Sequence, residues 1–224
     1  MNRFSTNPSR LIKPPQPPDG QGLFAEGLKD SFESFDHYYN FIASEKSYAN
    51  QSGERVVIQQ AQFRGVALNQ VYLQAARLSD VYLIECDLKQ SSWHEANFRY
   101  IEMVDCDLIG AEFMRATLSE LFFQNCNGSM ATFRLSKLQD VRFENCDLRD
   151  ANFYATDLSH VVFQNCDLRR VDFSAAVLKE VNFSGSNIEN INLSPNAIRG
   201  ITIQPQQAVD LVRVLGVTVA YSKQ

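Results

Sequence analysis

Cysteine is the residue type in this chain whose spacing bears most directly on chemistry. The 224 residues include five cysteines, each 20 residues after the one before: Cys86, Cys106, Cys126, Cys146 and Cys166. Zinc sites need Cys or His residues in close pairs that converge on one point, and this even spacing provides no such pairs. We expect five buried, reduced thiols that act as small apolar side chains, with no metal and no cofactor.

Carboxylates follow the same spacing. Asp87, Asp107, Asp147 and Asp167 each come one residue after a cysteine. Such a file of carboxylates could bind cations, but aspartate also supports turns by accepting hydrogen bonds from backbone N–H groups. We favour the turn-supporting role.

The sequence contains no recognisable catalytic motif. It has three histidines, and neither His94 nor His160 belongs to a local nucleophile–base motif. A glycine-rich loop that could hold phosphate is also absent. We therefore expect a protein that is not an enzyme and that has no small-molecule substrate.

The elements that position these residues follow from a period of five. From Ile58 to Ile203, every fifth residue is apolar at twenty-nine of thirty positions, and Gly128 is the exception. Neither a helix nor a strand repeats in this way. A square coil does, because each turn has four short extended faces and must stack on its neighbours to bury its apolar side chains. The period predicts an all-β solenoid of about 7.5 coils.

Residues 20 apart should then lie on top of one another. Two opposite faces repeat mainly large rings, such as Phe123 and Phe143 on one face and Phe133 and Phe153 on the other. The two remaining faces repeat mainly leucine and isoleucine. Rings and aliphatic side chains in this arrangement can fill a narrow square core at normal packing density.

The repeats resemble those of the pentapeptide-repeat family, which has an A(D/N)LXX pattern. Matching segments include Cys86–Leu88 (CDL), Ala151–Phe153 (ANF) and Val171–Phe173 (VDF). The resemblance covers residues 56–203 and implies a right-handed quadrilateral β-helix, which we place at residues 55–203.

Gly128 stands where the repeat calls for a core leucine. The glycine predicts either a local bulge, with Phe123 and Phe133 leaning into the space, or a joint between two segments of the rod. We favour the bulge, because the period continues in the same register on both sides.

The N-terminal region departs from the repeat. Residues 1–22 contain five of the seven prolines and predict a flexible tail. Residues 23–54 are expected to cap the first coil. Phe24, Leu28, Phe32, Phe35, Tyr39 and Ile42 form a helical stripe within them. A helix over 23–49 is our prediction, and an irregular first coil is the alternative.

The C-terminal region, residues 204–224, predicts a helix between Pro205 and Gly216. Part of its apolar surface would cap the last coil, and the surplus favours a symmetric homodimer over a capped monomer. The residues that we expect to serve dimerisation are Val209, Leu211, Val212, Val214 and Leu215.

Charge and hydropathy limit the other partners. The formal net charge is −5, which disfavours direct binding to nucleic acid. The sequence has no apolar run as long as a membrane helix, and its first residues lack the pattern of a signal peptide. We expect a cytoplasmic protein that does not bind membranes.

Outward positions of the repeat provide two candidate partner surfaces. The acidic file consists of Asp87, Asp107, Asp147, Asp150 and Asp167. The first-face patch consists of Tyr82, Ile84, Val104, Phe122 and Val162. Another face carries the outward apolar residues Tyr72, Met114, Leu135 and Tyr154. A file of apolar residues along a rod is either a partner surface or idle surface.

Within the family, the chain is most similar to loop-free members of the quinolone-resistance (Qnr) type. The similarity lies in the length and in the ending, residues 193–200 followed by 205–208 and 215–217. It implies a dimeric rod that presents carboxylates in place of DNA phosphates. Such a rod binds DNA gyrase and topoisomerase IV, competes with DNA and can protect these enzymes from fluoroquinolones.

Two other roles remain open from the sequence. The chain could be an adaptor that docks a different protein on the first-face patch, or a rod without a dedicated partner. Salt dependence separates the DNA-mimic role from the adaptor role. Binding by charge mimicry weakens steeply as the salt concentration rises, and apolar docking does not.

Overall fold

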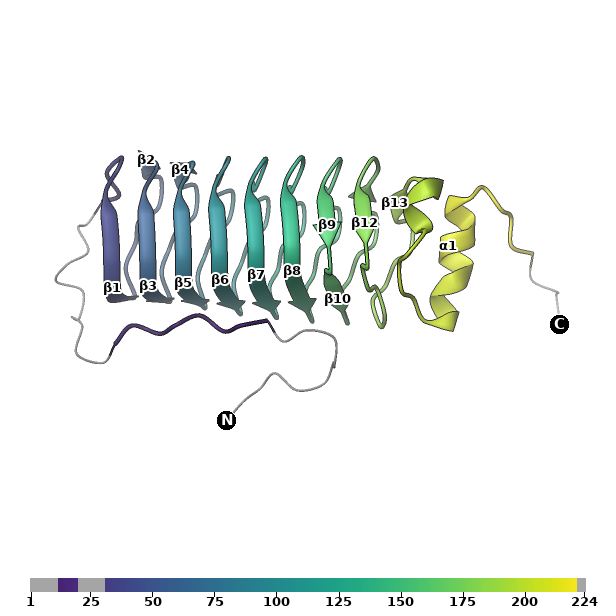
Figure 1. The fold of residues 1–224 in the computed structure, drawn as a ribbon, viewed down its shortest axis with the longest axis horizontal. Coiled ribbons are helices and arrows are strands. Elements are labelled where there is room, and N and C mark those ends of the chain that lie inside the picture. The colour runs from purple at the N-terminus through teal and green to yellow at the C-terminus, as the bar shows by residue number, and fades with distance from the viewer. Residues whose placement is uncertain (1–11, 20–30, 221–224) are drawn as a thin grey trace.

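The computed structural model describes residues 12–19 and 31–220. From residue 37 onward the chain winds into a parallel β-solenoid of about eight coils, stacked along one axis (Figure 1). The strands are β1 (His37–Ser44), β2 (Ser52–Glu54), β3 (Val57–Arg64), β4 (Tyr72–Gln74), β5 (Arg77–Ile84), β6 (Asn97–Val104), β7 (Thr117–Gln124), β8 (Lys137–Glu144), β9 (Asp157–Ser159), β10 (Val162–Gln164), β11 (Asp172–Phe173), β12 (Val177–Lys179) and β13 (Asn192–Leu193). Two 3₁₀ turns, Pro195–Ile198 and Pro205–Gln207, precede the helix α1 (Ala208–Val214).

Every strand pair is parallel and offset by 20 residues. Tyr38 pairs with Ile58, Ile58 with Leu78, and Leu78 with Phe98, and the same register continues to β12. The hydrogen bonds therefore run along the rod axis from one coil to the next. This register confirms the stacking that the period of five predicts.

The corners of the square coil occur at every fifth residue. Around one coil, Asp80, Glu85, Gln90 and Glu95 have φ values of 57°, 56°, 53° and 59°, in the left-handed region. Residues other than glycine are uncommon there, and Asn and Asp accept it best. Many residue types do so here because the parallel hydrogen bonds on both sides of each corner hold the backbone.

Stacked rings fill two opposite faces of the core, as the sequence predicts. The ring centroids of Phe123 and Phe143 are 4.6 Å apart at an interplanar angle of 10°, and those of Phe133 and Phe153 have the same values. Rings from opposite faces meet edge to face, as Phe143 and Phe153 do at 6.4 Å and 89°. Both are favourable aromatic geometries.

The five cysteines form one buried file of free thiols, as expected. Each Sγ lies near a carbonyl of the preceding coil, for example Cys106 near Leu83 O at 3.4 Å and Cys126 near Met103 O at 3.4 Å. A hydrogen bond with the neighbouring thiol and burial raise the pKa of Cys86 and of Cys166 far above the usual value. These end members of the file are protonated at neutral pH.

The described residues 31–54 form the first coil of the solenoid, so the helix that we predicted over 23–49 is wrong for residues 31–49. Strand β1 occupies His37–Ser44 and pairs with β3. Tyr38 and Tyr48 are buried in the phase of the repeat, whereas Phe35 and Tyr39 of the helical stripe are exposed. Pairing with β3 and burial of these rings outweigh the helical pattern, and residues 23–30 lie outside the described part.

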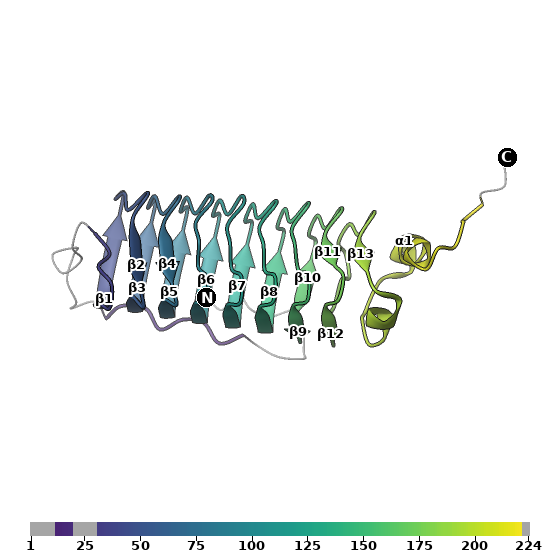
Figure 2. The same cartoon turned by 90° about the horizontal axis from the view of Figure 1, so that it is seen from above.

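Residues 12–19 lie along the outside of the rod (Figures 1 and 2). They have no regular secondary structure, but Pro15 is buried and Tyr82 Oη donates a hydrogen bond to the Pro15 carbonyl over 2.8 Å. This arrangement differs from the flexible tail expected for residues 1–22. The rest of that segment, 1–11 and 20–22, lies outside the described part.

The last coil is closed by residues 205–214, where the sequence predicts a helix. Gln207 is buried, and its Nε2 donates to the carbonyls of Phe183 and Ser186, each over 2.7 Å. Leu211 and Val214 of α1 pack on the core. Among the described residues, no helix has the length and apolar character needed to cross a membrane.

The rod continues without interruption through Gly128. Its N–H donates to Asp147 O over 2.7 Å, and the bridges of Asn127 to both adjacent coils are intact. A Cβ at residue 128 would lie 2.9 Å from Leu148 Cδ2. Leu148 therefore occupies the space that a side chain at 128 would need. The structure has neither the bulge nor the joint that we considered.

Candidate interaction surfaces

The acidic file lies on one face of the rod and supports its turns. The Oδ1 atoms of Asp87, Asp107, Asp147 and Asp167 accept hydrogen bonds from the N–H groups two residues later, at 3.0–3.2 Å. Asn127 holds the corresponding position in the remaining coil and makes the same bond to Ser129 N at 3.2 Å. Turn support is the role favoured from the sequence.

The same carboxylates are paired with cations. Lys89 Nζ lies 3.6 Å from Asp87 and 3.1 Å from Asp107. Arg149 Nε donates to Asp147 Oδ1 over 2.9 Å and lies 3.7 Å from Asp167 Oδ2. The file is thus part of a ladder of alternating charges along the rod.

The remaining members of the acidic file follow this pattern. Arg169 Nε donates to Asp167 Oδ1 over 2.9 Å, and Arg170 Nε donates to Asp150 Oδ1 over 2.7 Å. Side-chain hydrogen bonds from Arg149 and Arg169 lower the pKa of Asp147 and of Asp167, respectively. Asp147 and Asp167 are thus ionised at neutral pH, and lysine and arginine on the same face largely compensate the charge of the file.

The first-face patch is less accessible than its sequence positions indicate. Tyr82, Ile84, Val104 and Val162 are half-buried, and Phe122 is only 6% exposed. The described N-terminal residues reach this face at Tyr82. The five residues do lie in two columns on the outer side of β5, β6, β7 and β10, and the charged side chains of Glu102 and Arg142 stand between them in the same column as Tyr82.

More apolar surface is exposed on the third face, which contains the column Leu73 to Leu193. Leu135 and Tyr154 are 47% and 39% exposed, and Leu135 N donates to Tyr154 O over 3.1 Å. The Arg134 guanidinium lies 5.1 Å from the centre of the Tyr154 ring. Met114 is half-buried one coil away from Arg134. We call Met114, Leu135 and Tyr154 the third-face patch.

The five residues expected to serve dimerisation divide into two groups. Leu211 and Val214 pack on the end of the core. Val209 and Val212 are half-buried, and Leu215 is 49% exposed. Spaced by three, these last residues follow one side of the helical turn.

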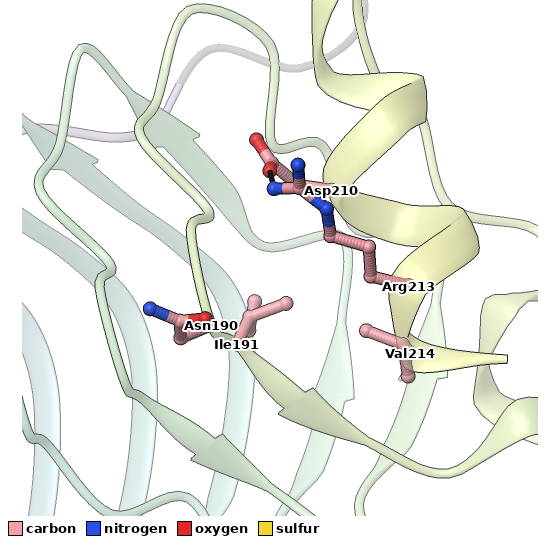
Figure 3. A pocket seen from close by; sticks show the side chains of 5 residues that line it. All are labelled: Asn190, Ile191, Asp210, Arg213 and Val214. Carbon is pink, nitrogen blue, oxygen red and sulfur yellow. Dashed lines mark hydrogen bonds and ion pairs between the residues drawn. The ribbon is translucent and has the colours of Figure 1, made fainter. Parts of the chain in front are cut away.

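A shallow hollow of about 250 Å³ lies between the last coil and α1. Asn190 and Ile191 line it on the coil side, and Asp210, Arg213 and Val214 line it on the helix side (Figure 3). Arg213 Nη1 donates to Asp210 Oδ1 over 3.0 Å within the helix. The two charges are thus engaged with each other at the rim of this hollow.

His94 and His160 lie beside carboxylates of the solenoid. His160 Nδ1 is 3.0 Å from Glu180 Oε2, and His94 Nε2 is 3.7 Å from Glu112 Oε2. Within residues 12–19 and 31–220, no three His, Cys, Asp or Glu side chains gather where they could hold a metal ion.

Comparisons with known proteins agree with the repeat geometry. A family model described as "Pentapeptide repeat region" matches residues 101–165 and 136–211. No curated protein matches the chain.

Solved structures provide likenesses at low identity. QnrB1, a plasmid-mediated fluoroquinolone resistance protein, is 20% identical, with a TM-score of 0.45 over 82% of this chain and 100% of the other. HetL of the cyanobacterium Nostoc sp. strain PCC 7120, involved in heterocyst differentiation regulation, is 18% identical, with a TM-score of 0.36 over 78% of this chain and 89% of its own. Rfr23 of the cyanobacterium Cyanothece 51142 is 21% identical, with a TM-score of 0.36 over 42% of this chain and 60% of its own.

Proposed function

We propose that this chain, which belongs to the pentapeptide-repeat family, is a non-enzymatic rod that binds DNA gyrase or topoisomerase IV through an apolar face. The observation that carries the mode of binding is the contrast between two faces. The carboxylates of the acidic file are paired with lysine and arginine, whereas Leu135 and Tyr154 of the third-face patch are exposed.

Compensated charges contribute little to attraction at a distance. A surface that imitates DNA needs carboxylates whose field extends into solvent, and an ion pair on the same face cancels most of that field beyond the Debye length. The Arg149 and Arg169 side chains would also meet the cationic DNA-binding surface of a topoisomerase. Docking through exposed apolar side chains depends less on charge, and Arg134 is the cation that lies against Tyr154 in the third-face patch.

The choice of topoisomerases rests on the resemblance of the ending, residues 193–200 and 205–217, to loop-free members of the Qnr type. Such a rod would lie in the cytoplasm with its target. We expect competition with DNA on the enzyme rather than strong protection from fluoroquinolones.

The test is a gyrase supercoiling assay, with topoisomerase IV decatenation beside it, titrated with the purified chain with and without ciprofloxacin. We compare the wild type with the third-face variant Leu135→Lys/Tyr154→Lys and with the acidic-file variant Asp147→Asn/Asp167→Asn. We expect the third-face variant to need at least about 10-fold more protein for the same effect. The acidic-file variant should stay within about 2-fold of the wild type.

Salt provides an independent measurement of the mode of binding. Raising salt from about 50 to about 200 mM should shift the inhibitory concentration by less than about 3-fold if docking is apolar. A steep salt dependence with loss of activity in the acidic-file variant would establish charge mimicry instead. No effect of micromolar protein on either enzyme would exclude topoisomerases, and an adaptor for another protein would become the leading role.

We also propose that the rod is a homodimer joined at α1. Val209, Val212 and Leu215 lie outside the group that packs on the core, and Leu215 is 49% exposed. Two copies of the chain related by a two-fold axis would pack these exposed apolar residues of α1 and its C-terminal end against each other.

A further inference from the structure

Residues 12–19 follow one corner of the rod across four coils, from Asn40 to Tyr100. Asp19 N donates to Asn40 Oδ1 over 2.9 Å, and Gln16 N donates to Asp80 Oδ1 over 2.9 Å. Lys13 Nζ lies 4.8 Å from the centre of the Tyr100 ring. Asn40, Asp80 and Tyr100 all occupy the same corner of the coil, so the segment runs along the rod axis in the direction opposite to that of the coils.

The hydrogen bonds that hold this segment involve side chains of the rod. Pro15 is buried, and its carbonyl accepts from Tyr82 Oη over 2.8 Å. Burial, together with the carboxylates of Glu102 and Asp80, raises the pKa of Tyr82, which keeps the hydroxyl a donor. No backbone-to-backbone hydrogen bond joins residues 12–19 to the described coils.

These contacts match the way in which proteins bind extended proline-rich peptides. Such peptides lack internal hydrogen bonds, enter aromatic-lined grooves at little entropic cost, and present their carbonyls to side-chain donors. The segment Lys13–Pro18 reads KPPQPP, which contains two overlapping P-x-x-P spacings. Tyr82 supplies a hydroxyl donor, Tyr100 supplies a ring, and Asp80 supplies an acceptor for the single N–H between the prolines.

We propose that the corner containing Asp80, Tyr82 and Tyr100 is a docking groove for an extended proline-rich segment of a partner protein, and that residues 12–19 occupy it until the partner displaces them. The groove recognises a carbonyl next to a buried proline, one backbone N–H, and a cation over a ring. It lies at a different corner from the third-face patch, so this inference does not depend on the proposed function.

Displacement is feasible because the bound segment is held by few contacts. A covalently joined segment has an effective concentration on the order of millimolar. A free peptide with the same intrinsic affinity for the groove therefore competes poorly with it. A partner that brings further contacts, or a change that weakens residues 12–19, would open the groove. The full chain should therefore bind a free peptide much more tightly when its own segment is weakened.

The experiment uses the full chain and a fluorescent peptide with the sequence of residues 11–20, LIKPPQPPDG. Fluorescence anisotropy measures peptide binding to the wild type and to the release variant Lys13→Glu/Pro15→Asp. We expect the release variant to bind at least about 10-fold more tightly than the wild type. Adding Tyr82→Phe should weaken its binding by about 5-fold, the effect of one lost hydrogen bond.

Two controls make the result specific. A peptide with aspartate in place of the residue equivalent to Pro15 should not bind, and Tyr72→Phe, on another face, should leave binding unchanged. Circular dichroism and thermal melting establish that each variant keeps the fold.

Three results would overturn the proposal. The release variant could fail to bind the peptide at peptide concentrations up to about 1 mM. The control peptide could bind as well as the original. Finally, sedimentation could show that the release variant assembles beyond the oligomeric state of the wild type without binding the peptide, and the occupant would then be another copy of the chain.

Discussion

Asp147 connects the backbone of its turn to the Arg149 guanidinium two residues later. Its carboxylate accepts from Arg149 N at 3.1 Å and pairs with the Arg149 guanidinium, and these contacts lower its pKa. A carboxyl group whose pKa is lower in the folded state stabilises the fold above the pKa of the unfolded chain. That contribution is lost as the pH falls through the folded pKa.

We therefore predict that Asp147→Asn reduces the loss of stability between pH 5 and pH 2. Asparagine keeps the turn, as Asn127 does in its own coil, and removes only the charge. At neutral pH the variant should be less stable by roughly 0.5 kcal/mol, because the ion pair is partly exposed to solvent. Urea unfolding at several pH values measures both effects. An unchanged pH profile would show that Arg149 contributes nothing to the stability of the turn.

Gly128 and Leu148 form one packing unit across two coils. A Cβ at residue 128 would come within 2.9 Å of Leu148 Cδ2. We predict that Gly128→Ala and Leu148→Ala are coupled, with Gly128→Ala more favourable by about 1 kcal/mol when residue 148 is alanine. Unfolding free energies of the two single variants and the double variant test this.

Leu168→Ala is the matched control for this coupling, because Leu168 occupies the same column one coil beyond Leu148. Gly128→Ala and Leu168→Ala should add within about 0.5 kcal/mol. Equal coupling at both leucines would mean that the effect spreads along the column rather than arising at the direct contact.

At the scale of the element, Gln207 decides how the solenoid ends. The last coil leaves carbonyls without a following coil, and the Gln207 amide donates to those of Phe183 and Ser186. We predict that Gln207→Glu destabilises the last coil by about 2 kcal/mol, because a carboxylate cannot donate and would face two carbonyl oxygens. Gln206→Glu, at the exposed neighbouring position, should have little effect.

Amide hydrogen exchange measures this locally. Phe183 N bonds to Thr202 O, and Thr202 N bonds to Val181 O, so these amides report on the last coil. In Gln207→Glu they should exchange faster while Phe123 in the middle of the rod is unchanged, since coils interact mainly with their neighbours. Uniform acceleration along the rod would contradict a local cap.

The elements can be predicted from the sequence only where the period of five is clear. From Ile58 onward, a large apolar residue at nearly every fifth position leaves one arrangement that buries all of them. In the first coil, Ala43 and Gly53 stand at the corresponding positions, so the phase set by Tyr38 and Tyr48 is hidden and a helical stripe competes with it.

The surfaces are less predictable for a different reason. The repeat identifies which side chains point outward, but it does not identify the residues that contact them. Tyr82 meets Pro15, 67 residues away in the sequence, and Asp147 pairs with Arg149, whose Nε also lies 3.7 Å from Asp167 of the next coil. The carboxylates of the ladder do repeat every 20 residues in the sequence, but the spacing alone does not state that cations on the same face compensate them or that Pro15 lies against Tyr82.

At the scale of the whole molecule, the end of the rod that carries α1 differs from the sides in how its backbone and core are covered. The coils satisfy their backbone hydrogen bonds along the axis, and α1 covers the last of them with Leu211 and Val214. The opposite side of α1 exposes Leu215, and Val217 follows at 50% exposure. A second copy placed end to end would bury these residues and double the length of the rod.

We predict that Val212→Asp/Leu215→Asp halves the mass measured by sedimentation and leaves the melting temperature of the solenoid nearly unchanged. Leu211→Ala should act differently, because this side chain packs on the core: it should lower stability by about 2 kcal/mol. Thr218→Asp, an exposed substitution close to the helix, controls for added charge. A monomeric wild type at micromolar concentration would refute the dimer and leave α1 as a cap alone.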